Sequence, residues 1–350
     1  MQTLRSERVK VKDSLEEINK LFCDNGWCDG LPVVPPTEDR VLRMMEGTPR
    51  GASELIGAVP PRLAELRVED VAINAVMAGC LPEFMPVIIT AMEAMLEPKF
   101  NLLGMQATTH PAAPLVIVNG PIAKKLDINS GTGCFGPGWR ANATIGRAIR
   151  LILWNVGGGI AAKGDMSTHG RPSKYSYCIA ENEDDSPWEP LQVEKGFDKE
   201  ASIVTVFACD TPHNINDHLS STALGMLTTI AYTMASVGST QAYSSSRDLF
   251  LILGPEHAAT IAGDGFKKND VKRFIYENAR IPHGKLKDRS VYGMATGSWP
   301  KWFNTSDDDA LIPIVQDWQR VVVVVAGGPG KHSVWLPSFI CPAVTREIKI

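Results

Sequence analysis

Several features that define specialised classes of protein are missing from this chain of 350 residues. It contains no run of about 18 apolar residues, so we expect no membrane-spanning helix. Its net charge of −4 leaves no basic footprint of the kind that binds nucleic acid. The N-terminal segment is charged and lacks the apolar region of a signal peptide. We therefore predict a cytoplasmic protein with neither a membrane nor a nucleic acid as a partner.

Regularly spaced cysteines are also missing. The seven cysteines are an odd number and are scattered, which favours free thiols over a disulfide framework. Cys23 and Cys28 are separated by four residues, and without a second pair this spacing is weak evidence for zinc. We therefore predict no cofactor. A metal enzyme is a weaker alternative, and its ligands, none of them at a recognised spacing, would come from His213, His218, His257 and Asp210.

Apolar runs alternate with helical patterns along the chain, which is typical of the α/β fold class. Short buried strands are expected at 115–118, at 203–207 and in the five valines of 321–325. We predict a mixed, largely parallel sheet flanked by helices. The chain is either one domain or two lobes. In the second case, residues 1–200 form an N-terminal helical and α/β lobe with glycine-rich loops, and residues 201–350 form a C-terminal α/β lobe.

The stretch 131–170 combines two glycine-rich loops with a helix and a polar cluster. Its first four glycines stand too close together for a regular element, so the backbone there turns repeatedly or approaches something closely. Ile145, Ile149 and Ile152 then line one face of a helix, which ends at the glycines of 157–159. A glycine loop that leads into a helix exposes N–H groups suited to an anion. A tight structural crossover is the alternative interpretation.

Loops that follow strands carry further candidate groups, because ligands of open α/β sheets bind beyond the carboxyl ends of the strands. The five valines lead into a glycine loop followed by Lys331, His332 and Ser333. Lys331 can supply positive charge, His332 a proton and the glycines backbone donors. A strand near 249–253 delivers His257 in the same way. For His332 a purely structural role is the alternative.

These patterns favour an enzyme that acts on a small anionic substrate by acid–base chemistry of the lyase, hydratase or hydrolase type. A cysteine nucleophile is an option, because a thiol near a helix N-terminus can have a lowered pKa. Packing is the alternative role for that thiol. The predicted catalytic residues are His332, Cys80, His169 and Lys331. The predicted substrate-binding residues are Gly327, Gly328, Gly330, Ser333, Arg140, Cys134, Asp165 and His257.

Five longer segments carry a family resemblance that covers most of the chain, from Asp29 to Ser333. They read DGLPVVPPTEDRV, AINAVMAGCLPEFMP, RANATIGRAIRLILWNVGG, KYSYCIAENEDDSPWEPL and GGPGKHS. Together they resemble the bacterial proteins labelled thiol-disulfide oxidoreductases or relatives of the UGSC-motif (seleno)proteins. The resemblance implies thiol or selenol chemistry, although the UGSC string is absent from this chain.

Two alternatives to the acid–base enzyme therefore stay open. A thiol-redox protein would join Cys23 to Cys28, or either of them to Cys80. A non-catalytic subunit would instead bind a partner enzyme, for example a (seleno)protein. The sequence leaves the oligomeric state open, a homo-oligomer included.

Overall fold

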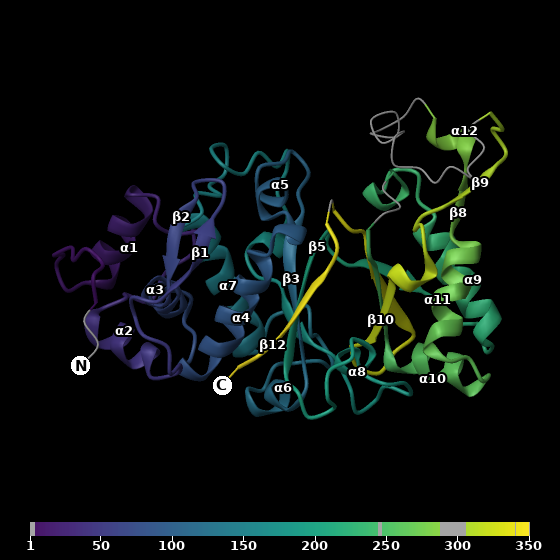
Figure 1. Ribbon diagram of the computed structural model, residues 1–350, viewed down its shortest axis with the longest axis horizontal. Coiled ribbons are helices and arrows are strands. Elements are labelled where there is room, and N and C mark those ends of the chain that lie inside the picture. Colours follow the sequence, from purple (N-terminus) through teal and green to yellow (C-terminus); the bar gives the residue numbers. More distant parts are fainter. Residues whose placement is uncertain (1–3, 244–246, 288–305, 340, 350) are drawn as a thin grey trace.

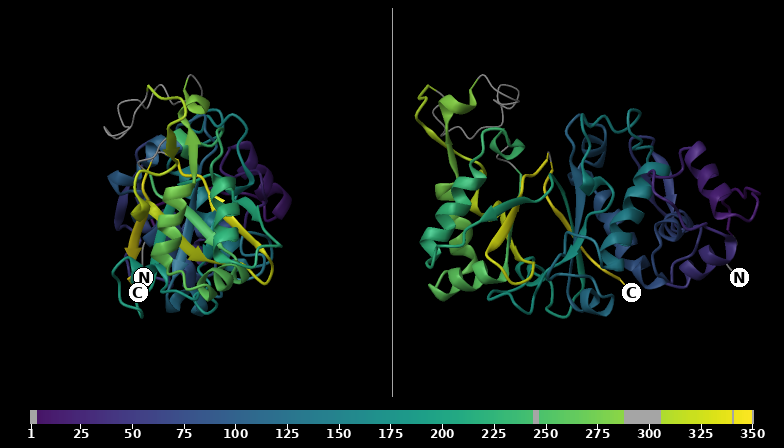
Figure 2. Two further views of the ribbon diagram at one scale, coloured as in Figure 1. Left: turned by 90° about the vertical axis from the view of Figure 1, so that its right-hand side faces the viewer. Right: turned by 180° about the vertical axis from the view of Figure 1, so that it is seen from behind.

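The computed structural model describes residues 4–243, 247–287, 306–339 and 341–349. Its central elements form four layers, in which two sheets lie face to face and helices cover both outer faces (Figures 1 and 2). This architecture confirms the predicted α/β class with mixed sheets flanked by helices.

The first sheet has the strand order β12-β5-β3-β4. Its strands are β3 (Ala113–Asn119), β4 (Cys178–Ala180), β5 (Ile203–Cys209) and β12 (Val344–Glu347). β3 runs parallel to β4 and antiparallel to β5, and β5 is also antiparallel to β12. The helices α4 (Met85–Met95) and α7 (Arg140–Asn155) pack on the outer face of this sheet, and α3 (Val68–Ala78) packs in turn on these two helices.

The second sheet has the order β10-β7-β11-β6. Its strands are β6 (His213–Asn216), β7 (Leu249–Leu253), β10 (Val321–Val325) and β11 (His332–Leu336). Its outer face is covered by α9 (Ala223–Met234), α10 (Pro255–Gly263) and α11 (Lys268–Asn278). β7 and β10 are parallel, whereas β11 is antiparallel to both β7 and β6.

Within each sheet, fewer neighbouring strands are thus parallel than the sequence led us to expect. A parallel crossover needs a dozen or so residues, and the segment 326–331 between β10 and β11 is shorter than that. β11 therefore turns back and pairs with the other edge of β7 in the antiparallel sense. The apolar pattern of a buried strand does not indicate whether the strand runs parallel or antiparallel to its neighbour.

The chain crosses between the sheets more than once. β5 and β12 lie after residue 200, yet both belong to the first sheet with β3 and β4. The predicted lobe boundary at 200 therefore does not coincide with the division between the sheets. The segment 337–343 carries the chain from β11 in the second sheet to β12 in the first.

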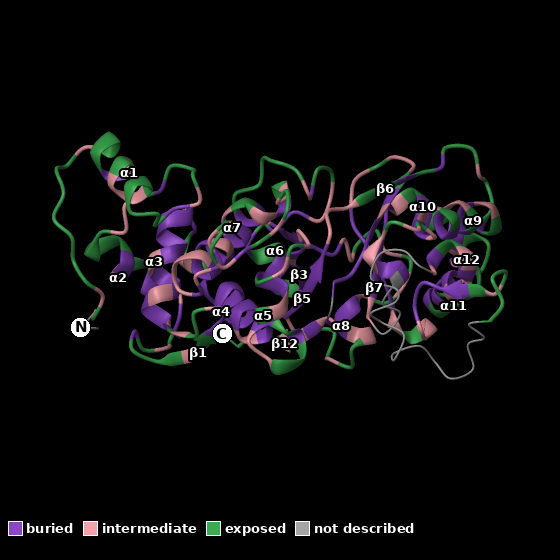
Figure 3. Cartoon of the chain, turned by 90° about the horizontal axis from the view of Figure 1, so that it is seen from above, coloured by how far each residue is buried: buried purple, intermediate pink, exposed green. Residues whose placement is uncertain are grey.

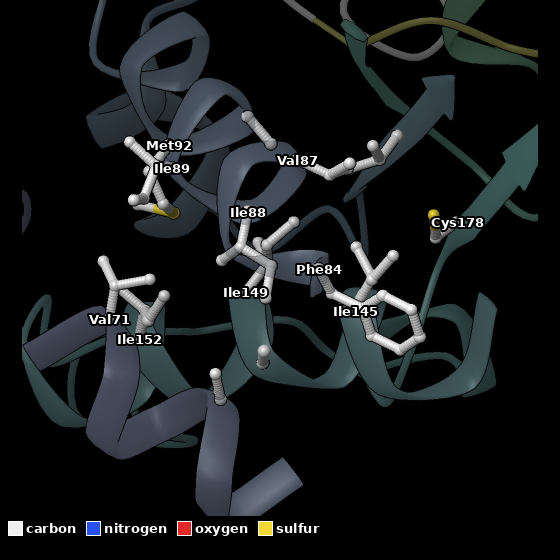
Figure 4. Close-up of a cluster of buried hydrophobic side chains, with 14 of the residues drawn as sticks. Val71, Phe84, Val87, Ile88, Ile89, Met92, Ile145, Ile149, Ile152 and Cys178 are labelled. Carbon is white, nitrogen blue, oxygen red and sulfur yellow. The ribbon is translucent and has the colours of Figure 1, made fainter. Parts of the chain in front are cut away.

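Alternating side chains build the layers of the core. Along β3, Val116 and Val118 face the outer helices, while Leu115 and Ile117 face the second sheet. The predicted isoleucine stripe of α7 is buried and packs against α3 and α4 (Figure 4). Each aliphatic side chain buried in this way stabilises the fold by about 1.5–3 kcal/mol.

Smaller elements complete the chain. They are α1 (Leu15–Asp24), α2 (Glu38–Met45), β1 (Leu55–Val59), β2 (Ala64–Arg67), α5 (Leu102–Gln106), α6 (Pro121–Lys125), α8 (Leu191–Glu194), β8 (Arg280–Pro282), α12 (His283–Leu286) and β9 (Leu311–Pro313). α1 and the segment before it are largely exposed, whereas α3 and α4 are mostly buried (Figure 3). Within the described ranges, no helix is long and apolar enough to cross a membrane.

Candidate functional site

The most distinctive polar contact joins His110 to Asp210. His110 precedes β3, Asp210 follows β5, and the antiparallel pairing of Ala113 with Cys209 brings these strand ends together. His110 Nε2 lies 2.5 Å from Asp210 Oδ1. Arg171, which precedes β4, places Nη1 3.1 Å from the same oxygen. The three side chains are only 19%, 14% and 23% exposed, so their interactions are partly shielded from water.

Neighbouring groups fix the orientation of this pair. The Phe339 ring stacks on the imidazole of His110, with centroids 4.6 Å apart and planes inclined by 16°. Phe339 lies on the segment that crosses between the sheets, and its N–H donates to the carbonyl of Ala208 in β5. The Tyr177 hydroxyl donates to the Asp210 carbonyl over 2.9 Å. The imidazole is therefore held by a carboxylate at one edge and by an aromatic ring on one face.

The carboxylate also selects a tautomer of His110. An ionised carboxylate only accepts hydrogen bonds, so Nε2 carries the proton in the neutral imidazole and Nδ1 carries the lone pair. Among the described residues, none forms a hydrogen bond with Nδ1. A histidine held in this way by a carboxylate has the arrangement of a general base, in which the positive charge gained on protonation is stabilised by its partner.

A second polar cluster lies beside the first. Asp165 forms ion pairs with Lys174 Nζ at 2.6 Å and with Arg150 Nη2 at 3.3 Å. Burial raises the pKa of Asp165, but hydrogen bonds from Lys174 and Ser167 outweigh burial, so that the pKa lies below its usual value. Ser167 Oγ also lies 3.4 Å from the His110 carbonyl, which joins the two clusters. The predicted substrate ligand Asp165 is therefore already neutralised by two protein cations.

The predicted glycine loops do converge, but they bind protein groups. The N–H of Gly327 donates to the Ser130 carbonyl over 2.8 Å, and Gly328 packs against Thr132. The N–H of Gly330 donates to the carboxylate of Glu256 over 2.7 Å. Two of the backbone donors expected to bind a substrate anion thus already have acceptors within the chain. This arrangement favours the structural interpretation of these loops.

Of the predicted residues at 331–333, Lys331 precedes β11, whereas His332 and Ser333 are its first two residues. His332 is exposed and its ring packs edge-on against His218 at 5.0 Å, whereas Ser333 is buried. Ser333 Oγ lies 2.7 Å from Nδ1 of His257, which is fully buried. Burial lowers the pKa of His257. The Lys331 ammonium donates to the His218 carbonyl over 3.1 Å. The expectation that Ser333 and His257 contact a substrate conflicts with their burial.

The predicted nucleophiles are buried thiols. Burial raises the pKa of Cys80 to about 12, and its Sγ donates to the Thr144 carbonyl. Burial raises the pKa of Cys134 to about 11. The sequence placed Cys80 near a helix N-terminus, but the loss of water there outweighs any such benefit. Neither thiol has the accessible, thiolate-favouring environment of a nucleophile, and packing explains both.

The structure does not bring Arg140 and His169, the last two predicted site residues, together with the others. Arg140 donates from Nε and Nη2 to the carbonyl of Gly79, the C-cap of α3, at 3.0 and 2.9 Å. Its guanidinium therefore caps a helix instead of serving as an anion clamp. His169 is exposed, and the adjacent Thr168 is hydrogen-bonded to the Thr109 carbonyl. His169 thus lies on the segment that runs beside the one carrying His110.

His110 and Arg171 were not predicted as site residues, and Asp210 was considered only as a metal ligand. Asp210 directly follows β5, and the segment of His110 directly precedes the apolar run of β3, whereas Arg171 lies seven residues before β4. A position next to an apolar run is the signal in the sequence that could have identified His110 and Asp210. Their convergence depends on the strand order β5-β3-β4, which the sequence does not show.

Neither metal chemistry nor similarity to a known protein adds to this picture. No group of three or more histidine, cysteine or acidic side chains suited to a metal occurs in the part of the chain that the structure describes. The suggested ligand set of His213, His218, His257 and Asp210 therefore gains no support, and the family resemblance stays a prediction. Comparison with known proteins gives no match to a family model, to a curated protein or to a solved structure.

Proposed function

We propose that this protein is an enzyme in which His110 transfers a proton to or from a small substrate. The observation that carries the proposal is the 2.5 Å contact between His110 Nε2 and Asp210 Oδ1. Asp210 holds the imidazole in the tautomer that leaves Nδ1 basic, and it stabilises the imidazolium once a proton has been taken up. Arg171 balances the charge of Asp210 in the resting state.

This assignment keeps the predicted chemistry and changes its residues. Many lyases, hydratases and hydrolases use a group that removes a proton from carbon or from water and later returns it. His332, which is exposed on β11, has no carboxylate to orient it among the described residues. His110 has one, together with an aromatic ring that restricts its rotation. It is therefore the better candidate for the general base.

The test compares turnover in the full-length protein and its variants. A panel of small carboxylic acids, hydroxy acids, esters and amides serves to find a substrate. His110→Gln is expected to lower kcat by roughly 10²–10⁴, the usual contribution of a general base. Asp210→Asn is expected to lower kcat while leaving the fold intact. His213→Gln, which changes an exposed histidine on β6, serves as the control. Unchanged turnover in His110→Gln would overturn the proposal.

The thiol alternative has one specific observation in its favour. Cys23 Sγ and Cys28 Sγ lie 3.3 Å apart at the end of α1. Cys23 is exposed, whereas burial raises the pKa of Cys28. A cavity of about 870 Å³ is lined by Phe22 and Trp27, neighbours of these thiols in the chain. We propose thiol–disulfide exchange at this pair as the second candidate function.

The exchange would proceed in two balanced steps. The Cys23 thiolate attacks a small-molecule disulfide, forms a mixed disulfide and releases the first thiolate. Cys28, after losing its proton to solvent, attacks Cys23 Sγ, forms the internal disulfide and releases the second thiolate. Mass spectrometry after treatment with oxidised glutathione is expected to detect a Cys23–Cys28 disulfide in the unaltered protein. In Cys28→Ser, the mixed disulfide between Cys23 and glutathione is expected to persist. If neither product forms, the thiol function is excluded, and the assignment of His110 is unaffected.

A further inference from the structure

A cavity of about 870 Å³ lies where the N-terminal segment and α1 meet α3 and the end of α7. Every residue that lines it belongs to the part of the chain that the structure describes. Its volume falls within the range of about 300–1,000 Å³ that is usual for small-molecule sites. Neither His110 nor Cys23 lines the cavity, so it is separate from both of the sites proposed above.

Apolar side chains form much of the cavity wall and are still in contact with water. Phe22 and Trp27 meet edge to face there, with their ring centroids 5.7 Å apart. Val9 and Val11 line the cavity from the N-terminal segment, and Trp154 lines it from α7. Val9, Val11 and Trp27 remain 51%, 42% and 38% exposed. Apolar surface of this kind favours a ligand that covers it.

The N-terminal wall of the cavity is anchored, although the described residues 4–13 form neither a helix nor a strand. The N–H of Arg5 donates to the buried carboxylate of Glu69 over 3.0 Å. Arg8 donates from Nε and Nη2 to the two oxygens of Glu38, at 3.2 and 2.6 Å. The two valines directly follow this second anchor. The ion pair also neutralises two of the charged groups that line the cavity.

The other charged groups of the lining act within the chain or face water. Asp70 accepts a hydrogen bond of 2.8 Å from the N–H of Arg67 and thereby caps the N-terminus of α3. Arg62 donates over 3.0 Å to the carbonyl of Asn155, the last residue of α7. Glu7 is exposed, so water solvates and screens its charge. A charged group on a ligand therefore gains little in this cavity.

Uncharged polar groups of the lining are paired with one another as well. Trp154 Nε1 donates to the carbonyl of Gly26 over 2.8 Å. Asn155 Nδ2 donates to Asn74 Oδ1 over 2.9 Å, and Asn74 Nδ2 donates to the carbonyl of Asp70 over 2.8 Å. All five of these residues line the cavity. Recognition here therefore depends on apolar contact more than on hydrogen bonds.

We propose that this cavity binds an uncharged, largely apolar small molecule that carries an aromatic ring. The apolar wall supplies the driving force, because a ligand that covers Val9, Val11 and Trp27 removes their surface from water. An aromatic ring fits this wall, because it can extend the edge-to-face contact between Phe22 and Trp27. The inference goes beyond both proposed functions and depends on neither of them.

Fluorescent probes that bind to the full-length protein test this inference. Phenylnaphthylamine is uncharged, anilinonaphthalenesulfonate is its anionic analogue, and naphthylmethylammonium is a cation. We expect phenylnaphthylamine to bind most tightly. Trp27→Ala is expected to weaken its binding roughly ten- to thirtyfold, and Val11→Asp, which places a charge in the apolar wall, about tenfold. Trp139→Ala and Val34→Asp are the matched controls, because Trp139 and Val34 are 39% and 40% exposed but do not line the cavity.

Each outcome supports the proposal or overturns it. It is overturned if the unaltered protein does not bind phenylnaphthylamine, or if each variant weakens binding no more than its control does. Tighter binding of either charged probe would overturn the uncharged class of ligand. Thermal unfolding without a probe excludes a folding defect, because all four substitutions are at partly exposed positions and we expect each variant to have a Tm close to that of its control.

Discussion

Gly328 lies so close to Thr132 that a Cβ added to Gly328 would stand 1.9 Å from the Thr132 hydroxyl oxygen and 2.9 Å from its Cα. Gly328 follows β10 of the second sheet, whereas Thr132 belongs to the loop before α7, which covers the first sheet. The contact thus joins the two halves of the four-layer structure. Only a residue without a side chain allows this approach.

Gly328→Ala is therefore expected to destabilise the protein by about 1–3 kcal/mol, the usual range for overpacking. Unfolding in urea measures the difference. Gly263→Ala is the control, because no atom lies within 4 Å of the added Cβ and the residue ends α10. For Gly263→Ala we expect an unchanged free energy of unfolding, or a gain of up to about 1 kcal/mol from the higher helix propensity of alanine. Equal effects of the two substitutions would contradict the close contact.

Stability should also fall on mild acidification because of His257. Burial lowers its folded pKa below the usual value of about 6.5, so the unfolded chain binds a proton more readily than the folded one does. The contribution of His257 is fully present above about pH 6.5 and is lost as the pH falls towards the folded pKa. Urea unfolding at several pH values between about 5 and 8 is expected to show this loss. His257→Gln should reduce the slope, and an unchanged slope would contradict the assignment.

Local patterns in the sequence were enough to predict the elements that carry the core. The isoleucines of α7 recur at helical spacing and are buried, and the five valines form β10, a fully buried strand. Both patterns arise from side chains a few residues apart, so strand order does not affect them. The α/β class follows from such segments alone.

The site could not be predicted in the same way. His110 and Asp210 are 100 residues apart, and their contact exists because β3 and β5 happen to be neighbours. The roles predicted for Cys80 and Gly330 gain no support from the structure, for a related reason. A cysteine near a helix start and a glycine loop after a strand are local features, whereas the burial of Cys80 and the Glu256 carboxylate that occupies the N–H of Gly330 come from distant parts of the chain.

Cysteine reactivity offers a direct test of the burial argument. Cys23 is exposed, so alkylation at neutral pH is expected to modify it first. Cys80, Cys134 and Cys341 should react slowly, because burial raises their pKa values to about 12, 11 and 12 and blocks access. Site-resolved mass spectrometry gives the rates. Rapid labelling of Cys80 in the folded protein would restore it as the candidate nucleophile.

The ion pair between Asp29 and Arg147 is expected to be the strongest electrostatic support of the N-terminal region. Arg147 on α7 donates from Nε and Nη2 to both oxygens of Asp29, at 2.9 Å each, and the side chains are only 15% and 4% exposed. Arg147→Met leaves a buried carboxylate without its partner, which typically costs about 3–5 kcal/mol. Combining it with Asp29→Asn should recover part of that loss, because the unpaired charge is then removed. Lys20→Ala, at an exposed ion pair with Asp24, is the control and should leave the free energy of unfolding almost unchanged. Urea unfolding of the unaltered protein, of Arg147→Met, of Asp29→Asn and of the double variant gives the coupling energy between Asp29 and Arg147. If the effects of the two single substitutions are additive, this pair contributes no more than a surface contact.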